Sequence, residues 1–319
     1  MKHIMFAMVL KRNFLNRRAT SLHSFGLLLA AVFALAAQPG TAMAASAGAN
    51  LTLGIENGLV QESAVEVGAT AQSLADLIGN ATGRKVIWEA RYSTAAANHG
   101  AGGQGFDFMF SKPANLTGTL LAKGWHLVAV ARLPIEFGTD FIAQPCPGKP
   151  GEVLLGGPTL AVLGVQDAPA TTCVPVAQIW KSPSAILLTP AKGSLIDKVA
   201  SKLWLEHAST LPRIVHVEYQ NAITGFMQTT RAAVIGAVTP MVSKTWKAEG
   251  GVVLAHQALP FWALLAAPGT SSDTVDKVRA TLVAAGRDSF LNKSLHIDGW
   301  ENGNPKTYAE LLRWLDAKP

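Results

Sequence analysis

The sequence lacks the short motifs that mark common hydrolases and metalloenzymes. It contains no G-x-S-x-G nucleophile elbow and no H-E-x-x-H zinc motif. Paired carboxylates at strand ends are not evident either. These absences argue against an enzyme, and they predict neither a metal site nor a cofactor. The histidines of residues 45–319 are scattered, without metal-ligand spacing between any two of them: His99, His126, His207, His216, His256 and His296.

Clusters of basic residues are also missing. The whole chain has 27 basic and 21 acidic residues and a net charge of +6. Five of the basic residues lie in the first 44 positions, which hold no acidic residue, so the rest of the chain has a net charge of only +1. No group of lysines and arginines with interleaved aromatic residues occurs there. This composition argues against nucleic acid as a partner.

The first 44 residues predict a signal peptide. The apolar run over 25–37 has 13 residues, fewer than the roughly 20 that span a bilayer. Ala42-Met43-Ala44 fits the small-x-small rule, which predicts cleavage after Ala44. We expect export to the periplasm by the Sec or the twin-arginine route, with an uncleaved membrane anchor as the alternative. The basic start of this segment consists of Lys2, Lys11, Arg12, Arg17 and Arg18.

Cysteine is scarce, with two residues in the chain, Cys146 and Cys173. An even number of cysteines in an exported protein predicts one disulfide, here closing a loop rich in proline and glycine. Two free buried thiols are the alternative. Neither cysteine has the neighbours of a nucleophile or of a metal ligand.

Strand and helix patterns alternate along most of the chain. This alternation predicts an α/β fold with mostly parallel sheets, and the length suits one two-lobed unit. The segment 133–180 is less regular. The predicted strands are 51–55, 85–88, 106–110, 126–131, 185–188, 214–217, 234–238, 252–254 and 263–267. The predicted helices are 67–78, 116–121, 195–203, 221–231, 275–282 and 308–315.

Several predicted strands feed a polar turn and then a helix. Phe106, Phe108 and Phe110 alternate with other residues, and Ser111 and Lys112 follow at the end of that strand. Ligands of open α/β sheets bind at the carboxyl ends of strands, and helix starts there suit anions. The turns supply the candidate ligand-binding residues: Glu56, Asn57, Ser111, Lys112, Gly193, Ser194, Asn221 and Thr239.

Each candidate also has an alternative structural role, and the weight of that alternative differs between them. Lys112 is the best anion contact, because a cation near a helix start is otherwise unfavourable. Ser111 and Ser194 equally suit the capping of a helix, and Asn221 suits a cap better than a ligand contact. Trp262 suits core packing better than the lining of a cleft.

In their order, these segments resemble the phosphate/phosphite/phosphonate group of periplasmic substrate-binding proteins of ABC transporters. The resemblance implies a two-lobed type II periplasmic-binding-protein fold, with the ligand cleft between the lobes and two chain crossings. Lobe 1 would comprise 45–135 plus 250–319, and lobe 2 would comprise 136–249. The resemblance rests on GIENG at 54–58, DFMFSKP at 107–113, GWHLVA at 124–129, PAKGS at 190–194 and HVEYQN at 216–221.

The resemblance also implies a function. We expect an exported solute-binding protein that captures a small anion, either a phosphonate- or phosphate-like oxyanion or a small carboxylate. Its partner would be an ABC permease in the inner membrane. A periplasmic sensing subunit for a membrane histidine kinase is the main alternative, and an enzyme on the same fold is a third.

Overall fold

A computed structural model describes residues 49–58, 62–91, 105–157, 160–161, 164, 170–230 and 233–317, so the predicted signal peptide, 1–44, lies outside it. Its elements, in chain order, are β1 (Leu51–Glu56), α1 (Ala64–Thr82), β2 (Val86–Arg91), β3 (Phe108–Ser111), α3 (Ala114–Ala122), β4 (His126–Arg132), β5 (Gly138–Ala143), β6 (Glu152–Leu155), β7 (Thr172–Pro175), the 3-10 helix η2 (Val176–Lys181), β8 (Ile186–Thr189), α4 (Leu195–His207), β9 (Arg213–His216), α5 (Gln220–Thr230), β10 (Ile235–Val238), α6 (Pro240–Ala248), β11 (Val252–Ala258), β12 (Ala263–Ala266), α7 (Ser272–Ala284), α8 (Phe290–Leu295), β13 (Gly299–Glu301) and α9 (Pro305–Asp316).

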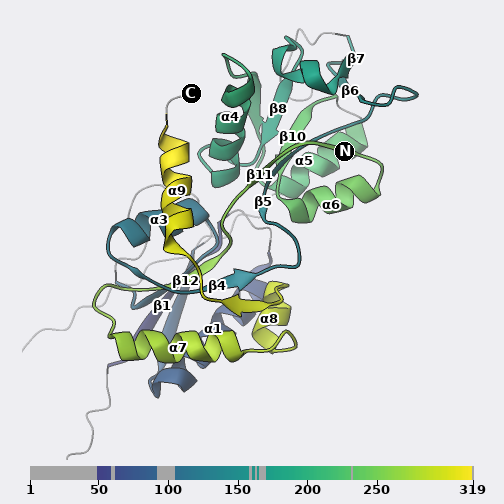
Figure 1. Cartoon of the computed structure of the whole chain (residues 1–319). Helices are drawn as coiled ribbons and strands as arrows, with labels where there is room; N and C mark the ends of the chain where they lie inside the picture. The colour runs from purple at the N-terminus through teal and green to yellow at the C-terminus, as the bar shows by residue number, and fades with distance from the viewer. Residues whose placement is uncertain are drawn as a thin grey trace, which may run out of the picture. The chain divides into compact units, whose positions relative to one another are not determined.

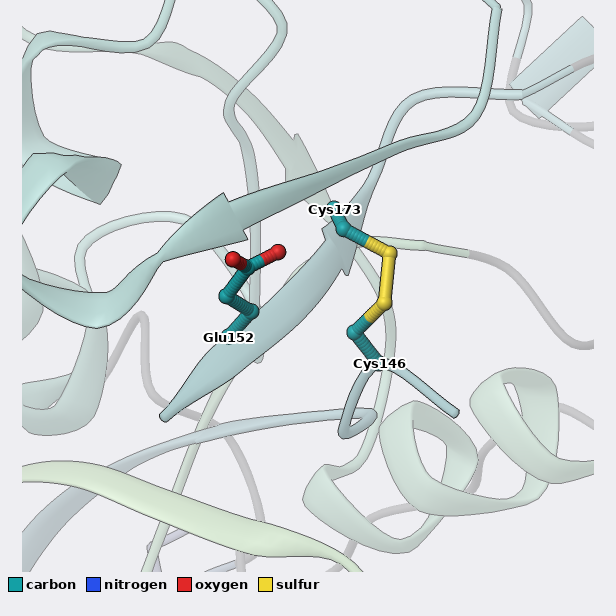
Figure 2. A group of neighbouring side chains, drawn as sticks. All are labelled: Cys146, Glu152 and Cys173. Carbon is teal, nitrogen blue, oxygen red and sulfur yellow. A yellow bond between two sulfur atoms is a disulfide. The ribbon is translucent and has the colours of Figure 1, made fainter. Parts of the chain in front are cut away.

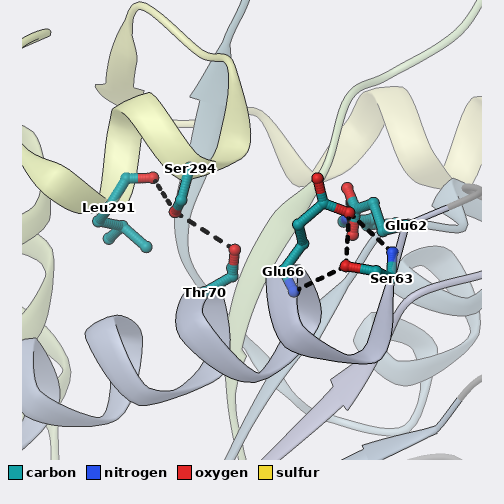
Figure 3. A network of polar contacts seen from close by, with 7 residues as sticks. Glu62, Ser63, Glu66, Thr70, Leu291 and Ser294 are labelled. Atoms are coloured by element: carbon teal, nitrogen blue, oxygen red, sulfur yellow. Dashed lines mark hydrogen bonds and ion pairs between the residues drawn. The ribbon is translucent and has the colours of Figure 1, made fainter.

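The first helix, α1, shows why the predicted helices form where they do. The Ser63 hydroxyl accepts the backbone N–H of Glu66, and the Glu66 carboxylate accepts the backbone N–H of Ser63, which makes a capping box (Figure 3). Gly83 ends the helix with φ 68°, a left-handed conformation that glycine adopts without strain. The buried stripe matches the sequence pattern and contains Val67, Ala71, Leu74 and Ile78.

The first sheet has six strands in the order β13-β4-β12-β3-β1-β2. β1 pairs in parallel with β2 and β3, and both β3 and β4 run antiparallel to β12, so β1 to β4 all point the same way. Its central strands β1, β3 and β12 are buried on both faces. Phe108 and Phe110 belong to the core cluster that includes α1, whereas Met109 packs with Leu116 and Leu120 of α3. The strand begins at Phe108, two residues later than predicted.

The second sheet has five strands in the order β11-β5-β10-β8-β9. All of them except β5 point the same way. Phe141 and Leu187 pack with Trp204 of α4, and Ile142 and Leu188 pack with residues of α5 and α6. Helix α4 thus covers one face of the sheet, and α5 and α6 cover the other (Figure 1). β8 and β10 are buried on both faces, which explains why their segments read as apolar runs in the sequence. In both sheets most strands share one direction, as predicted.

The segment 133–180, which the sequence leaves irregular, holds part of this core. β5 lies inside the second sheet, and all six of its residues are buried. The hairpin of β6 and β7 follows. The predicted disulfide joins Cys173 of β7 to Cys146, just before β6, with a Cα–Cα distance of 5.6 Å (Figure 2).

The chain crosses between the sheets twice. The first crossing, 133–137, joins β4 to β5, and the second, 259–262, joins β11 to β12. β4 and β3 share one direction, so the first crossing leaves the first sheet at the edge where β1 and β3 also end. It enters the second sheet beside the end of β10, because Asp140 of β5 pairs with Val238.

Two features bear on the arrangement of the sheets. β11 pairs with β5, so the strand 252–258 belongs to the second sheet. Helix α9 packs on α3 and also bonds to α4, where Trp314 Nε1–H donates to Glu206 Oε1 over 2.6 Å. Among the described residues, every helix is too short or too polar to cross a lipid bilayer.

Candidate functional site

The predicted turns of the first sheet lie side by side. Glu56 ends β1 and pairs in register with Ser111, which ends β3. Asn57 and Lys112 follow directly, and the Lys112 backbone N–H donates to the Glu56 carbonyl over 3.0 Å. All four residues are buried although their side chains are polar or charged. Parallel pairing therefore brings together four of the predicted site residues.

Lys112 is held by a partner that the sequence did not reveal. Its Nζ lies 2.7 and 2.8 Å from the two carboxylate oxygens of Glu62, and 4.5 Å from the ring centroid of Trp262. Burial lowers the pKa of the Lys112 ammonium, and the Glu62 carboxylate opposes this shift. Glu62 stands just before the capping box of α1 (Figure 3). The ammonium is thus neutralised by the chain's own carboxylate.

Trp262 packs in the core, as the sequence favours, and its ring also contacts Lys112. It is buried in the core cluster of the first sheet, and its ring meets Phe110 edge-on at 6.3 Å. It also stacks on Phe261 at 4.4 Å, and Tyr308 donates its hydroxyl to the Phe261 carbonyl. The indole face is therefore fixed where it contacts the Lys112 ammonium.

The Ser111 hydroxyl makes a local contact. It donates to the carbonyl of Pro113 over 3.0 Å. Pro113 is the N-cap residue of α3, which has no side-chain cap. Ser111 therefore fixes the turn between β3 and α3 and does not cap the helix start.

The second sheet presents a matching set of turns, centred on Asp197 of α4. Ser194 is the N-cap of this helix, and its hydroxyl accepts the Asp197 backbone N–H. The Asp197 carboxylate accepts the Gly193 N–H at 2.8 Å and the Thr189 hydroxyl at 2.8 Å. His216 Nε2, at the end of β9, lies 3.0 Å from the same carboxylate. The predicted residues Gly193 and Ser194 are thus both engaged with Asp197.

Thr239 is the N-cap residue of α6, and Gln220 satisfies it. The Gln220 amide oxygen accepts the Thr239 backbone N–H at 3.0 Å and its hydroxyl at 2.9 Å. Helix α5 begins at Gln220, so the prediction that Asn221 caps this helix is wrong. Asn221 is exposed and lies in a hollow of about 430 Å³ between α5 and α6. The turn shifts by one residue because Gln220, not Asn221, reaches the next strand end.

A third group of polar side chains lies close to the two crossings, on β5, α6 and β11. The Asp140 carboxylate of β5 accepts the Ser243 hydroxyl and lies 2.6 Å from His256 Nδ1. Glu136, in the first crossing, lies 3.5 Å from His256 Nε2. Here Ser243 donates to Asp140 rather than to the histidine, so the group lacks the serine–histidine contact that activates a nucleophile.

Helix starts of the second sheet pack against the first. Leu195 in the first turn of α4 and Met241 in the first turn of α6 are partly buried against the core cluster of the first sheet, and Val199 of α4 belongs to that cluster. Together with the two crossings, these contacts bring the carboxyl edges of both sheets to one region.

Sequence reasoning missed the residues that hold the predicted ones. Each is an acidic or amide side chain in or close to a predicted turn but not among the predicted site residues: Glu62, Asp197 and Gln220. Asp197 was detectable as an acidic residue three positions after a serine N-cap. Glu62 had no such signal, because it lies fifty positions from Lys112.

Cys146, Glu152 and Cys173 place ligand-type atoms within 4.8 Å of one another (Figure 2). Metal ions bind cysteine as thiolate, and sulfur atoms joined in a disulfide carry no thiolate. The Glu152 carboxylate instead lies 3.7 Å from Lys149 Nζ. While the disulfide is intact, this group of described residues is therefore not suited to bind a metal ion.

No protein-family model and no curated protein matches the sequence. Solved structures do match its fold. PhnD1 from Prochlorococcus marinus in complex with methylphosphonate has a TM-score of 0.59 at 9% identity, covering 83% of this chain and 96% of that one. A Xanthomonas citri protein bound to ATP has a TM-score of 0.57 at 12% identity, covering 84% and 97%. A binding protein component of an ABC phosphonate transporter from Pseudomonas aeruginosa has a TM-score of 0.52 at 11% identity, covering 83% and 84%.

At sequence identities this low, the structural likeness shows a shared fold alone. The predicted two-lobed α/β fold of type II periplasmic binding proteins is confirmed, and so is the likeness in fold to phosphonate-type binding proteins. The order of the strand-end motifs, rather than any one of them, carried this prediction.

Proposed function

We propose that this chain is an exported solute-binding protein that captures a small polar solute between two lobes. One observation carries the proposal. The polar carboxyl edges of the two sheets are joined by both crossings, and the starts of α4 and α6 pack against the first sheet. Ligands of open α/β sheets bind at such edges. A hinge motion about the two crossings would close the site, and exclusion of water would strengthen each polar contact.

We propose the lobe division predicted from the sequence, 45–135 plus 250–319 and 136–249, with one adjustment. Because β11 pairs with β5, we place the second hinge segment at 259–262, where the chain passes from β11 to β12. The proposed ligand-binding residues remain those of the strand-end turns: Glu56, Asn57, Ser111, Lys112, Gly193, Ser194, Asn221 and Thr239.

The proposed location is the periplasm, and the proposed partner is an ABC permease of the inner membrane. The signal-peptide pattern of 1–44 supports the location. The partner is supported by a fold neighbour that is a binding component of an ABC phosphonate transporter. A sensing subunit for a membrane histidine kinase would use the same fold with a different docking face.

The charge of the solute is the finer part of the proposal. Lys112 supports the predicted anion, because an ammonium is a point-charge clamp for oxyanions and carboxylates. Its ion pair with Glu62 opposes that assignment, since an anion would have to compete with a carboxylate already in place. The proposed function is therefore stated for a small polar solute of either charge.

Thermal unfolding of the mature chain, with each compound at millimolar concentration, tests the proposal. The compounds are oxyanions, phosphonates, small carboxylates, amines and neutral amides. A ligand present at about 100 times its Kd should raise the Tm by roughly 5–10 °C, because it binds only the folded state. A library without a single shift would overturn the proposal.

A further inference from the structure

The start of α4, where the proposed function places Gly193 and Ser194, carries an arrangement centred on Asp197. Three donors converge on one buried carboxylate, Asp197, from three segments: the Thr189 hydroxyl at the end of β8, the Gly193 backbone N–H in the turn, and His216 at the end of β9. Asp197 is only 8% exposed. These donors are the kind that a bound oxyanion would use at a helix start. The chain's own carboxylate has taken that place.

Other helices of the chain show that this is more than a common acidic first turn. Asp273 occupies the first turn of α7, where Ser271 is the N-cap. It is exposed, and its carboxylate pairs with Lys277 of the same helix at 2.7 Å. Asp197, in contrast, draws donors from two neighbouring strands of the sheet.

The other groups of the site that could bind an anion also have partners within the chain. Glu62 neutralises Lys112 with both carboxylate oxygens. The amide oxygen of Gln220 takes the N–H and the hydroxyl of Thr239, and Pro240 at the start of α6 has no N–H to offer. Near these turns lie the buried carboxylates of Glu56 and Asp140 as well. Among the buried charged side chains at these turns, the carboxylates of Glu56, Asp140 and Asp197 outnumber the ammonium of Lys112.

We propose that Asp197 determines specificity by excluding anions from the α4 start, so that the solute presents a cationic or neutral N–H donor group to this lobe. This inference rests on the proposed function and narrows its ligand to solutes such as amines or amides. The physical reason is that a second anion beside a buried carboxylate meets strong like-charge repulsion. The N–H and O–H donors that could compensate for this repulsion already bind Asp197.

Calorimetric titration of three chains tests the inference: the wild type, Asp197→Ala and Asp197→Asn. The probes are inorganic phosphate, methylphosphonate, acetate, ethanolamine and acetamide. We expect no measurable binding of the anions to the wild type. Asp197→Ala should bind phosphate with a Kd about 100-fold lower than the limit that the wild-type titration sets. Asp197→Asn, which keeps the shape of the side chain, should gain anion binding in the same direction if the alanine variant fails to fold. Asp273→Ala is the matched control and should behave as the wild type.

The outcomes separate this inference from the proposed function. Anion binding by the wild type, or no gain of anion binding in either folded Asp197 variant, overturns the inference and leaves a solute-binding role intact. A gain by the variants supports the role of Asp197 even when no probe binds the wild type. Wild-type binding of ethanolamine or acetamide, weakened in Asp197→Ala by about tenfold or more, supports both.

Discussion

At the scale of single residues, carboxylates control this region of the molecule. Glu62 holds Lys112, Asp197 gathers donors from two strands, and Asp140 links Ser243 to His256. Each carboxylate is at least partly shielded from water, and a shielded charge is tolerated when it is paired and hydrogen-bonded. Removal of one partner therefore leaves the other as an unpaired charge in a poorly hydrated place.

Lys112→Met is expected to lower the free energy of unfolding by about 1–3 kcal/mol, because it leaves the Glu62 carboxylate without its cation. The double variant Lys112→Met with Glu62→Gln should recover most of this loss, since no charge then remains unpaired. Urea unfolding without ligand measures both effects.

An exposed ion pair provides the control for Lys112. Lys277 pairs with Asp273 at 2.7 Å, and both side chains are more than half exposed, at 58% and 73%. Lys277→Met should change the free energy of unfolding by less than about 1 kcal/mol. An equal effect of the two lysine variants would contradict the view that burial gives the Lys112 pair its importance.

At the scale of elements, serine caps set the starts of four helices, and a covalent link holds the least regular segment. Ser63, Ser194, Ser271 and Ser289 each accept a backbone N–H at the start of their helix. The β6–β7 hairpin instead has only four residues in each strand, and two strands alone are marginal in water. The disulfide at its base compensates for this.

The double variant Cys146→Ser with Cys173→Ser is expected to lose about 3–4 kcal/mol of stability, from the entropy of the 27-residue separation that the disulfide closes. Thermal unfolding of the variant and of the reduced wild type should give matching, lowered Tm values. Proteolysis should then cut first within 144–176. An unchanged Tm in both would show that the hairpin is held by its packing alone.

At the scale of the whole molecule, helix α9 forms a second link between the elements of the two sheets, besides the crossings. Trp314 of α9 donates to Glu206 of α4, and Lys202 of α4 donates to the Ala317 carbonyl just past α9. These bonds restrain the motion that the proposed closure requires. They are hydrogen bonds between side chains or chain ends, so they can break without disturbing either core.

The double variant Lys202→Met with Glu206→Ala should separate α4 from α9. We expect a larger radius of gyration in solution scattering and a loss of about 1–3 kcal/mol of stability, from two hydrogen bonds. Glu310→Ala is the control, because Glu310 pairs only weakly with Arg313 within α9, at 3.8 Å. A variant with the scattering curve of the wild type would show that these bonds do not hold the two helices together.

The α/β class, the strand-end turns and the positions of the longer helices could be predicted from the sequence, because these depend on periodicity and on residues a few positions apart. Phe108, Met109 and Phe110 alternate in the sequence and face opposite cores in the sheet. Ser194 caps α4 as its place before an amphipathic stretch predicts. The two cysteines likewise form the disulfide that their number and predicted export suggested.

The groups that meet at the site could not be predicted, because the fold brings together residues that are far apart in the sequence. Lys112 and Glu62 are fifty positions apart, and Asp140 and His256 are 116 apart. Such pairs depend on strand register and on side-chain direction, which local patterns do not encode. A turn such as Gly193-Ser194 therefore reads as an anion site in the sequence. The folded chain shows its donors already bound to Asp197, because the sheet brings β8, β9 and α4 to one point.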